Sequence, residues 1–170
     1  LTRRILVSSN FYECMLSVYK SIGGLLFGAV SVEPDYNSVV RFHFLPVGSY
    51  RYAKDDNGVI DTFCRTYKDS AVNIVNKYGY ENCSDSIKAD YDDNRDSLFE
   101  LVYFVEKNKD YKPSSPLAKH KKYKSVVYQL GQDEFLQDSG TDIFPFVVFE
   151  SEVNGEDNYP TGTGFTTYQK

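Results

Sequence analysis

Apolar residues recur every three or four positions in one stretch after residue 59. The set comprises Ile60, Phe63, Cys64, Tyr67, Ala71, Ile74 and Val75. This spacing places side chains on one face of a helix, and it is the clearest such pattern in the chain. We therefore predict a helix over residues 59–75, although residues 74–80 are also compatible with a strand.

The N-terminal pattern predicts a short strand followed by a capped helix. Residues 5–7 are apolar, and Asn10 precedes Glu13 by three positions, which is the arrangement of a capping box. The helix is expected over about residues 11–20. The Gly-Gly pair at 23–24 is expected to end it.

An apolar run follows at residues 25–30 and is typical of a strand buried on both faces. Turn-forming residues at 34–37 separate it from a second apolar stretch at 38–45, which ends before Pro46. We expect these two strands to form an antiparallel pair.

Shorter patterns divide the second half of the chain. A polar stretch at 81–96 is expected to form a loop with a short acidic helix. Further strands are expected at 98–105, 123–130 and 143–151. The first two of these strands are separated by a basic, proline-containing loop at 107–122.

Together these elements predict an α+β fold, with a mixed, largely antiparallel sheet flanked by two or three helices. The chain has 170 residues, of which 41% are hydrophobic and 25% charged, enough to bury a core without disulfides or metals. We expect a single domain over residues 1–151 and a polar, loosely attached tail over 152–170. The first residue is Leu rather than Met, which predicts an excised fragment.

Charge narrows the expected classes of partner, and cysteine content indicates the cellular compartment. The net charge is −5 and the pI is near 5.0, so the field of the whole chain repels nucleic acid and anionic lipid. No apolar run approaches the roughly 20 residues of a membrane-spanning helix. Cys14, Cys64 and Cys83 are an odd number, and no disulfide framework is expected. We expect a reducing compartment, the cytoplasm or the nucleus, and no membrane partner.

Motifs for catalysis or cofactor binding are missing, with one exception. No glycine-rich phosphate loop is present, and no pair of Cys or His residues has the spacing of zinc ligands. We therefore expect no cofactor and no metal. One catalytic alternative stays open: Cys83 as an exposed nucleophile with His43 as its base, which would make the chain a cysteine-dependent hydrolase.

Charge is segregated along the second half of the chain. Between Lys107 and Lys124 there are seven lysines and one histidine against a single acid, whereas residues 133–157 carry eight acids and no base. This asymmetry indicates an electrostatic contact with a partner. The residues expected to make that contact are Lys119, His120, Lys121, Lys122 and Lys124. The alternative is a solvated lysine-rich loop that shields a sheet edge.

Residues 5–46 resemble the opening of the MPN (Mov34/JAB) domain family, and residues 74–78 and 84–90 correspond in this resemblance to the metal-site strand and its Ser/Asp loop. The resemblance rests on a strand and capped helix followed by Gly-Gly-Leu-Leu-Phe-Gly at 23–28, and on a strand ending in Phe-Leu-Pro at 44–46. The hydrolytic branch of that family needs a nearby Glu and a His-x-His-Pro motif, and residues 78–84 contain no histidine. The resemblance therefore implies a module without metal or catalysis that pairs with another subunit.

These observations predict a non-catalytic protein–protein interaction domain that is a subunit or module of a larger assembly. Its expected partner is another protein subunit. Two alternatives remain, the cysteine-dependent hydrolase and nucleic-acid binding through the lysine-rich loop. The overall acidity makes nucleic acid the less favoured partner.

Overall fold

The structure is a computed structural model that describes residues 2–132 and 134–151. Within these ranges helices accompany the strands and every strand pairing is antiparallel, which confirms the predicted α+β class. The polar tail expected over 152–170 lies outside the described residues. No helix in the described ranges is long and apolar enough to cross a membrane.

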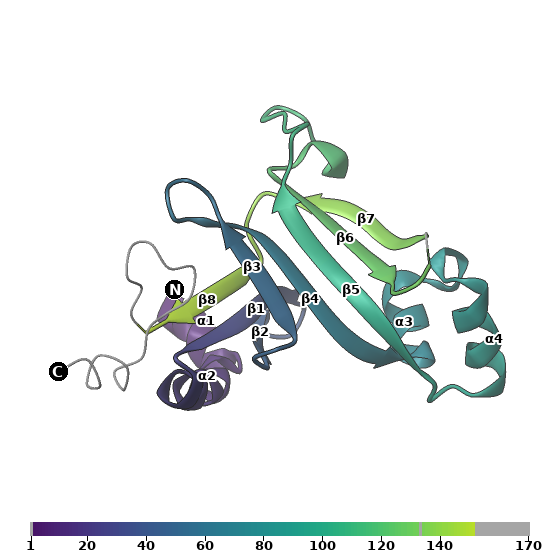
Figure 1. Ribbon diagram of the computed structural model, residues 1–170, viewed down its shortest axis with the longest axis horizontal. Helices are drawn as coiled ribbons and strands as arrows, with labels where there is room; N and C mark the ends of the chain where they lie inside the picture. The colour runs from purple at the N-terminus through teal and green to yellow at the C-terminus, as the bar shows by residue number, and fades with distance from the viewer. Residues whose placement is uncertain (1, 133, 152–170) are drawn as a thin grey trace, which may run out of the picture. The chain divides into compact units, whose positions relative to one another are not determined.

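The contacts of the chain gather in two compact units, whose elements are labelled in Figure 1. Unit 1 is discontinuous in sequence and comprises Leu1–Gly48 and Pro145–Lys170. Unit 2 is the continuous stretch Ser49–Phe144. Each unit has its own sheet, whereas the sequence analysis expected one: the strand order is β2-β1-β8 in unit 1 and β3-β4-β5-β6-β7 in unit 2.

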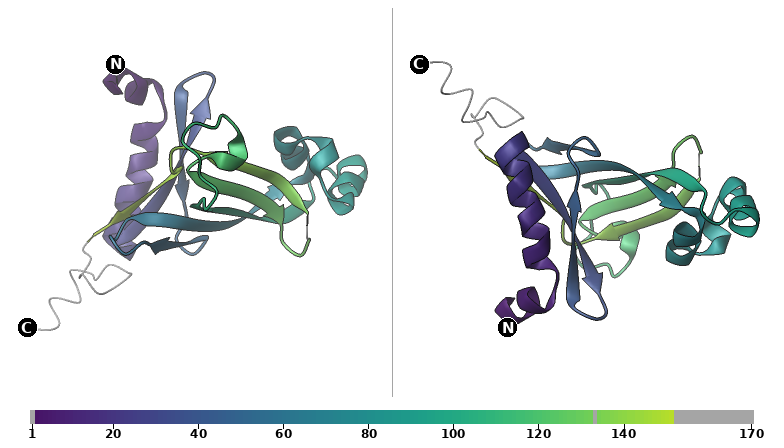
Figure 2. Two further views of the ribbon diagram at one scale, coloured as in Figure 1. Left: turned by 90° about the horizontal axis from the view of Figure 1, so that it is seen from above. Right: turned by 90° about the horizontal axis from the view of Figure 1, so that it is seen from below.

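Unit 1 packs one long helix on a three-stranded sheet. Its elements are α1 (Thr2–Ser8), α2 (Phe11–Leu25), β1 (Phe27–Asp35), β2 (Val39–Leu45) and β8 (Phe146–Glu150). α2 lies along one face of the sheet (Figure 2), and the buried side chains of Cys14, Val18 and Val30 meet there. The expected antiparallel pairing of the first two strands is confirmed, with Val30 opposite Phe44.

Three N-terminal predictions are wrong: the strand at 5–7, the helix stop at 23–24 and the capping box at Asn10, whose side chain does not cap α2. Residues 5–7 lie in helix α1 rather than in a strand; the Arg-Arg pair before them is a good helix former. α2 continues through the Gly-Gly pair at 23–24, and both glycines keep negative φ. The left-handed residue that ends the helix is Leu26, with φ 72°, and its N–H bonds to the carbonyl oxygen of Ile22. The end of α2 is therefore set at Leu26, and the two glycines before it do not stop the helix.

Asn10 joins the corner between the two helices to strand β2, and does not cap α2 through its side chain. Its Nδ2 donates to the carbonyl oxygen of Phe42 at 2.7 Å, and its Oδ1 accepts from the N–H of Phe42 at 2.9 Å. β2 is an edge strand, so this side chain satisfies main-chain groups that have no neighbouring strand on that side.

Replacing Asn10 by Ala should lower the free energy of unfolding by about 1–3 kcal/mol, because both main-chain groups of Phe42 lose their partner. Urea unfolding followed by far-UV circular dichroism measures the change. Asn37→Ala, at an exposed turn position, is the matched control and should change stability by less than about 0.5 kcal/mol. Equal effects of the two substitutions would contradict the bridging role of Asn10.

Unit 2 is a five-stranded antiparallel meander with two short helices. Its strands are β3 (Tyr50–Lys54), β4 (Ile60–Ser70), β5 (Leu98–Lys107), β6 (Tyr123–Gln129) and β7 (Phe135–Thr141). Its helices are α3 (Ala71–Tyr78) and α4 (Asp85–Asp93), with single turns η1 (Tyr80–Asn82) and η2 (Ala118–His120). α3 and α4 lie where β4 ends and β5 begins (Figure 1), and contribute Ile74, Val75 and Ile87 to a core shared with Leu101 and Val127. The strands expected at 98–105 and 123–130, and the acidic helix in 81–96, are confirmed.

The helix predicted over 59–75 is wrong in its first part. Residues 60–70 form β4, which pairs with β3 on one side and β5 on the other. Intervals of four residues also fit a strand, because four is a multiple of its two-residue repeat. A helix does begin at Ala71, where the hydroxyl of Ser70 accepts from the N–H of Asn73 at 3.4 Å. Residues 74–78 are therefore helical.

Candidate partner-binding loop

The lysine loop, residues 107–124, runs from the end of β5 to the start of β6 and has a closed base. Asn108 closes it: its Nδ2 donates to the carbonyl oxygens of Lys119 and Lys121, both at 2.8 Å. Its backbone N–H donates to the carbonyl oxygen of Lys122 at 3.0 Å. These hydrogen bonds go to the main chain of the lysines. They hold the loop backbone in place and do not engage the lysine side chains.

His120 braces the inside of this loop. Its Nδ1 is 2.7 Å from the hydroxyl of Ser115, and its carbonyl oxygen accepts from the N–H of Lys112 at 3.0 Å. The imidazole is half-buried. The structure thus gives His120, which the sequence analysis placed with the partner-binding residues, a contact within the loop itself.

Lys121 pairs with an acid of the same chain. Its Nζ is 2.6 Å from Oδ2 of Asp142, just beyond the end of β7. The hydrogen bond from Lys121 lowers the pKa of Asp142; partial burial opposes this shift, and the positive charge of Lys121 adds a smaller lowering. Part of the positive charge of the lysine loop is therefore neutralised by an acid of unit 2.

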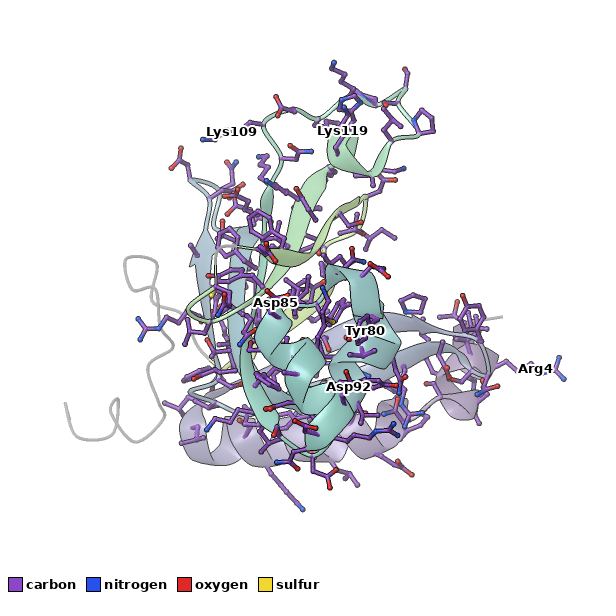
Figure 3. All side chains as sticks on the ribbon, turned by 90° about the vertical axis from the view of Figure 1, so that its right-hand side faces the viewer. Arg4, Tyr80, Asp85, Asp92, Lys109 and Lys119 are labelled. Atoms are coloured by element: carbon purple, nitrogen blue, oxygen red, sulfur yellow. The ribbon has the colours of Figure 1, made fainter. Side chains whose placement is uncertain are left out.

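The other lysines of the loop are exposed. They are Lys107, Lys109, Lys112, Lys119, Lys122 and Lys124. Nζ of Lys122 lies 5.3 Å from the centre of the Tyr123 ring, a cation–π contact that holds this side chain at the base of the loop. Figure 3 shows Lys109 and Lys119 on the loop and Asp85 and Asp92 on α4, so the positive loop and the acidic helix occupy separate parts of unit 2.

Gly140 is a site residue that the sequence analysis missed. It lies in β7, where η2 of the lysine loop packs directly against the strand. A Cβ atom at this position would collide with the carbonyl oxygen of Ala118 and lie 2.9 Å from Cβ of Lys121. An isolated glycine in a strand marks such a close approach, but the sequence did not indicate a strand here, so this signal could not be used.

The structure contradicts the exposure of Cys83 on which the cysteine-dependent hydrolase hypothesis rested. Cys83 was expected to be exposed, but its side chain is only 2% exposed and donates to the carbonyl oxygen of Gly79 at 3.2 Å. Burial raises the pKa of the thiol, with a smaller opposing effect from Lys88, so the thiolate is disfavoured. His43 lies on β2 of unit 1, whereas Cys83 belongs to unit 2.

Among the described residues, the other two cysteines are not activated thiols and the acidic side chains form no metal centre. Burial raises the pKa of Cys14 and of Cys64, so neither thiol is activated. Within residues 2–132 and 134–151, no group of three or more His, Cys, Asp or Glu side chains could hold a metal ion. The lysine loop is therefore the candidate site that remains among the described residues.

Comparison with known proteins decides the family. The model of the family described as bacteriophage head to tail connecting protein matches residues 3–167. The chain belongs to this family. Head-to-tail connecting proteins are structural components rather than enzymes, in agreement with the predicted absence of catalysis.

Two relatives of this connector chain are portal proteins by name. It is 32% identical over 154 residues to the portal protein of Salmonella phage epsilon15, covering 89% of this chain and 28% of the relative. It is 29% identical over 141 residues to the probable portal protein of Bordetella phage BPP-1, covering 80% of this chain and 25% of the relative. The chain thus spans about a quarter of the length of these relatives.

The resemblance to the MPN family is wrong. The connector family accounts for residues 3–167, including the stretch on which that resemblance rested. The structure gives the physical reason: the Gly-Gly-Leu of 23–25 ends helix α2, and the strand begins only at Phe27. The Gly-Gly-Leu part of the resemblance therefore lies in a helix, where an MPN domain would have a strand.

Proposed function

We propose that this chain is a structural part of a phage head-to-tail connector and that its lysine loop holds a neighbouring phage protein. Membership of the connector family is the observation that carries the assembly role. It supports other phage proteins as partners, which agrees with the protein subunit expected from the sequence.

The geometry of the lysine loop supports its part in this contact. Six exposed lysines project from a loop whose main chain is held by Asn108, in a chain whose net charge is −5. A local positive patch on an acidic chain attracts an acidic surface and orients it during approach. The loop is therefore suited to set the rate and the direction of docking.

Replacing Lys119, Lys121, Lys122 and Lys124 by Ser should change the melting temperature by no more than about 4 °C. The ion pair of Lys121 with Asp142 is exposed, and exposed pairs contribute little to stability. Association with the partner should slow by at least about tenfold at low salt and become less dependent on ionic strength.

The partner is identified by capture on the immobilised chain from cells that express the head and tail proteins of the phage, with mass spectrometry of the bound proteins. Surface plasmon resonance at several salt concentrations then compares the wild type with the quadruple variant. The matched control removes the same charge elsewhere, with Lys20, Lys54, Lys68 and Lys77 changed to Ser.

Three results would count against the proposal. The first is that no phage structural protein is retained. The second is that both quadruple variants slow association equally, which would mean that net charge acts rather than the loop. The third is that duplex DNA binds through the loop and competes with the protein partner, which would favour the nucleic-acid alternative.

A further inference from the structure

An apolar pocket lies between the first turns of α2 and the sheet of unit 1. Its volume is about 250 Å³ and its lining is entirely apolar. Side chains of α2 and of all three strands line it: Phe11, Cys14, Met15, Val30, Val32, Phe42, Val147 and Phe149. Val147, in the edge strand β8, is the most exposed of them at 43%, so the pocket opens beside β8.

The size and chemistry of this pocket suit a single aromatic ring. An apolar cavity of about 150 Å³ takes up a benzene molecule, whereas drug-sized ligands need about 300 Å³ or more. A charged or hydrogen-bonding group would find no partner in the apolar lining. A phenyl group has no polar atom and meets both conditions.

The chain itself carries a phenyl group that can fill the pocket. Residues 152–170 lie outside the described ranges, and their large apolar side chains are Val153, Tyr159, Phe165 and Tyr168. Either tyrosine would bury its hydroxyl group against apolar atoms. Val153 follows the described chain too closely to fold back as far as Val147. Phe165 is therefore the residue whose side chain suits the pocket.

The intervening chain is long enough for Phe165 to reach the pocket. Phe165 lies 14 positions after Ser151, and an extended chain of that length spans about 45–50 Å. Val147 lies four positions before Ser151, which is about 14 Å along a strand. Gly155 and Pro160 are turn-forming residues between them, so the chain can reverse its direction.

The sequence around Phe165 also favours an extended segment beside β8. Phe165, Thr166, Thr167 and Tyr168 are all residue types enriched in strands. An added strand at a sheet edge places alternate side chains in pockets on one face of the sheet. In such a strand Phe165 points to one face, and Thr166 and Tyr168 point to the other.

We propose that residues 164–168 fold back beside β8 and insert the phenyl ring of Phe165 into the apolar pocket, where it covers Cys14. This differs from the loosely attached tail that the sequence analysis expected over 152–170. The inference goes beyond the proposed connector function. It does not depend on the lysine loop, which belongs to unit 2.

Cys14 provides a probe of the pocket, because its thiol lines the pocket and is buried. Peptide mass spectrometry measures the alkylation rate of each of the three cysteines in the full chain. Cys14 should alkylate at least about tenfold faster in Phe165→Ala than in the wild type, because burial of a phenylalanine ring favours the closed state by about that factor or more. Cys83, buried in unit 2, should keep its rate within about twofold and thus report an intact fold.

Two matched variants and a free ligand separate ring insertion from other effects. Tyr168→Ala removes an aromatic side chain from the same segment and should change the rate at Cys14 by no more than about twofold. Phe165→Leu refills most of the pocket and should restore most of the protection. Benzene should slow the alkylation of Cys14 in Phe165→Ala and leave the wild type unchanged, because the wild-type pocket is already filled.

The proposal is overturned if Cys14 alkylates equally fast in the wild type and in Phe165→Ala, or if Tyr168→Ala has the larger effect. It is equally overturned if Cys83 accelerates together with Cys14, because the substitution then acts on the stability of the whole chain. Slower alkylation of wild-type Cys14 in benzene would show an empty pocket. Protection that requires an added phage protein would assign the pocket to that partner, and either result would also overturn the proposal.

Discussion

Replacing Leu101 by Ala should lower the free energy of unfolding by about 2–5 kcal/mol. Leu101 is fully buried in β5 and lies in the cluster that joins α3 and α4 to the sheet. Truncation removes its contacts with these helices and leaves a cavity that close-packed neighbours fill only in part.

Urea unfolding measures this change, and strand β5 provides the matched control. Leu98 lies on the same strand but is 66% exposed, so Leu98→Ala should change stability by less than about 0.5 kcal/mol. A cost below about 1 kcal/mol for Leu101→Ala would show that the helices do not pack on β5 as described.

Replacing Gly140 by Ala should destabilise the protein by about 1–3 kcal/mol and loosen the lysine loop. The added methyl group meets the carbonyl oxygen of Ala118 and the main chain at Tyr123, neither of which is the end of a flexible side chain. Either η2 moves away from β7 or the strand shifts. Hydrogen exchange of the amides in residues 108–122 should therefore accelerate, together with a fall in the urea midpoint.

The control is another strand glycine with room for a methyl group. A Cβ on Gly28 would lie 3.4 Å from Cβ of Ser21, an ordinary contact, so Gly28→Ala should be nearly neutral. If Gly140→Ala leaves exchange in the loop unchanged, η2 is not held by β7, and the fixed backbone assigned to the lysine loop would have to be abandoned.

Strand β4 shows why spacing alone misassigned part of unit 2. Ile60 with Cys64, and Phe63 with Tyr67, are each four residues apart, which suits one helical face but equally two opposite faces of a strand. What settles the conformation is the pairing of β4 with β3 and β5, whose residues are remote in the sequence. The helical signal became unambiguous only after Ser70, where a cap residue supports it.

The two edge strands of unit 2 were missed for different reasons. β7 has the sequence Phe-Leu-Gln-Asp-Ser-Gly-Thr, and only Leu136 is buried, so its composition carries almost no strand signal. β3 does alternate, with Tyr50 buried and Arg51 exposed, and the Asn-Gly at 57–58 is a hairpin signal that could have revealed it.

The candidate site was predictable in position but not in detail. The density of lysines between Lys107 and Lys124 identified the loop from composition alone. Its internal order depends on Asn108, His120 and Asp142, whose contacts join positions 5 to 21 residues apart. Such contacts follow from the meander of β5, β6 and β7, which no local pattern specifies.

The position of β8 has a consequence for the order in which the chain takes shape during synthesis. β1 is the central strand of its sheet, but β8, its second neighbour, leaves the ribosome about 100 residues after β2. Until then the edge of β1 that β8 will cover is unpaired, and two strands alone are marginally stable in water. All of unit 2 is complete before that edge can close. Nascent chains that stop short of Phe146 therefore expose an unpaired strand, which a chaperone or another growing chain can recognise.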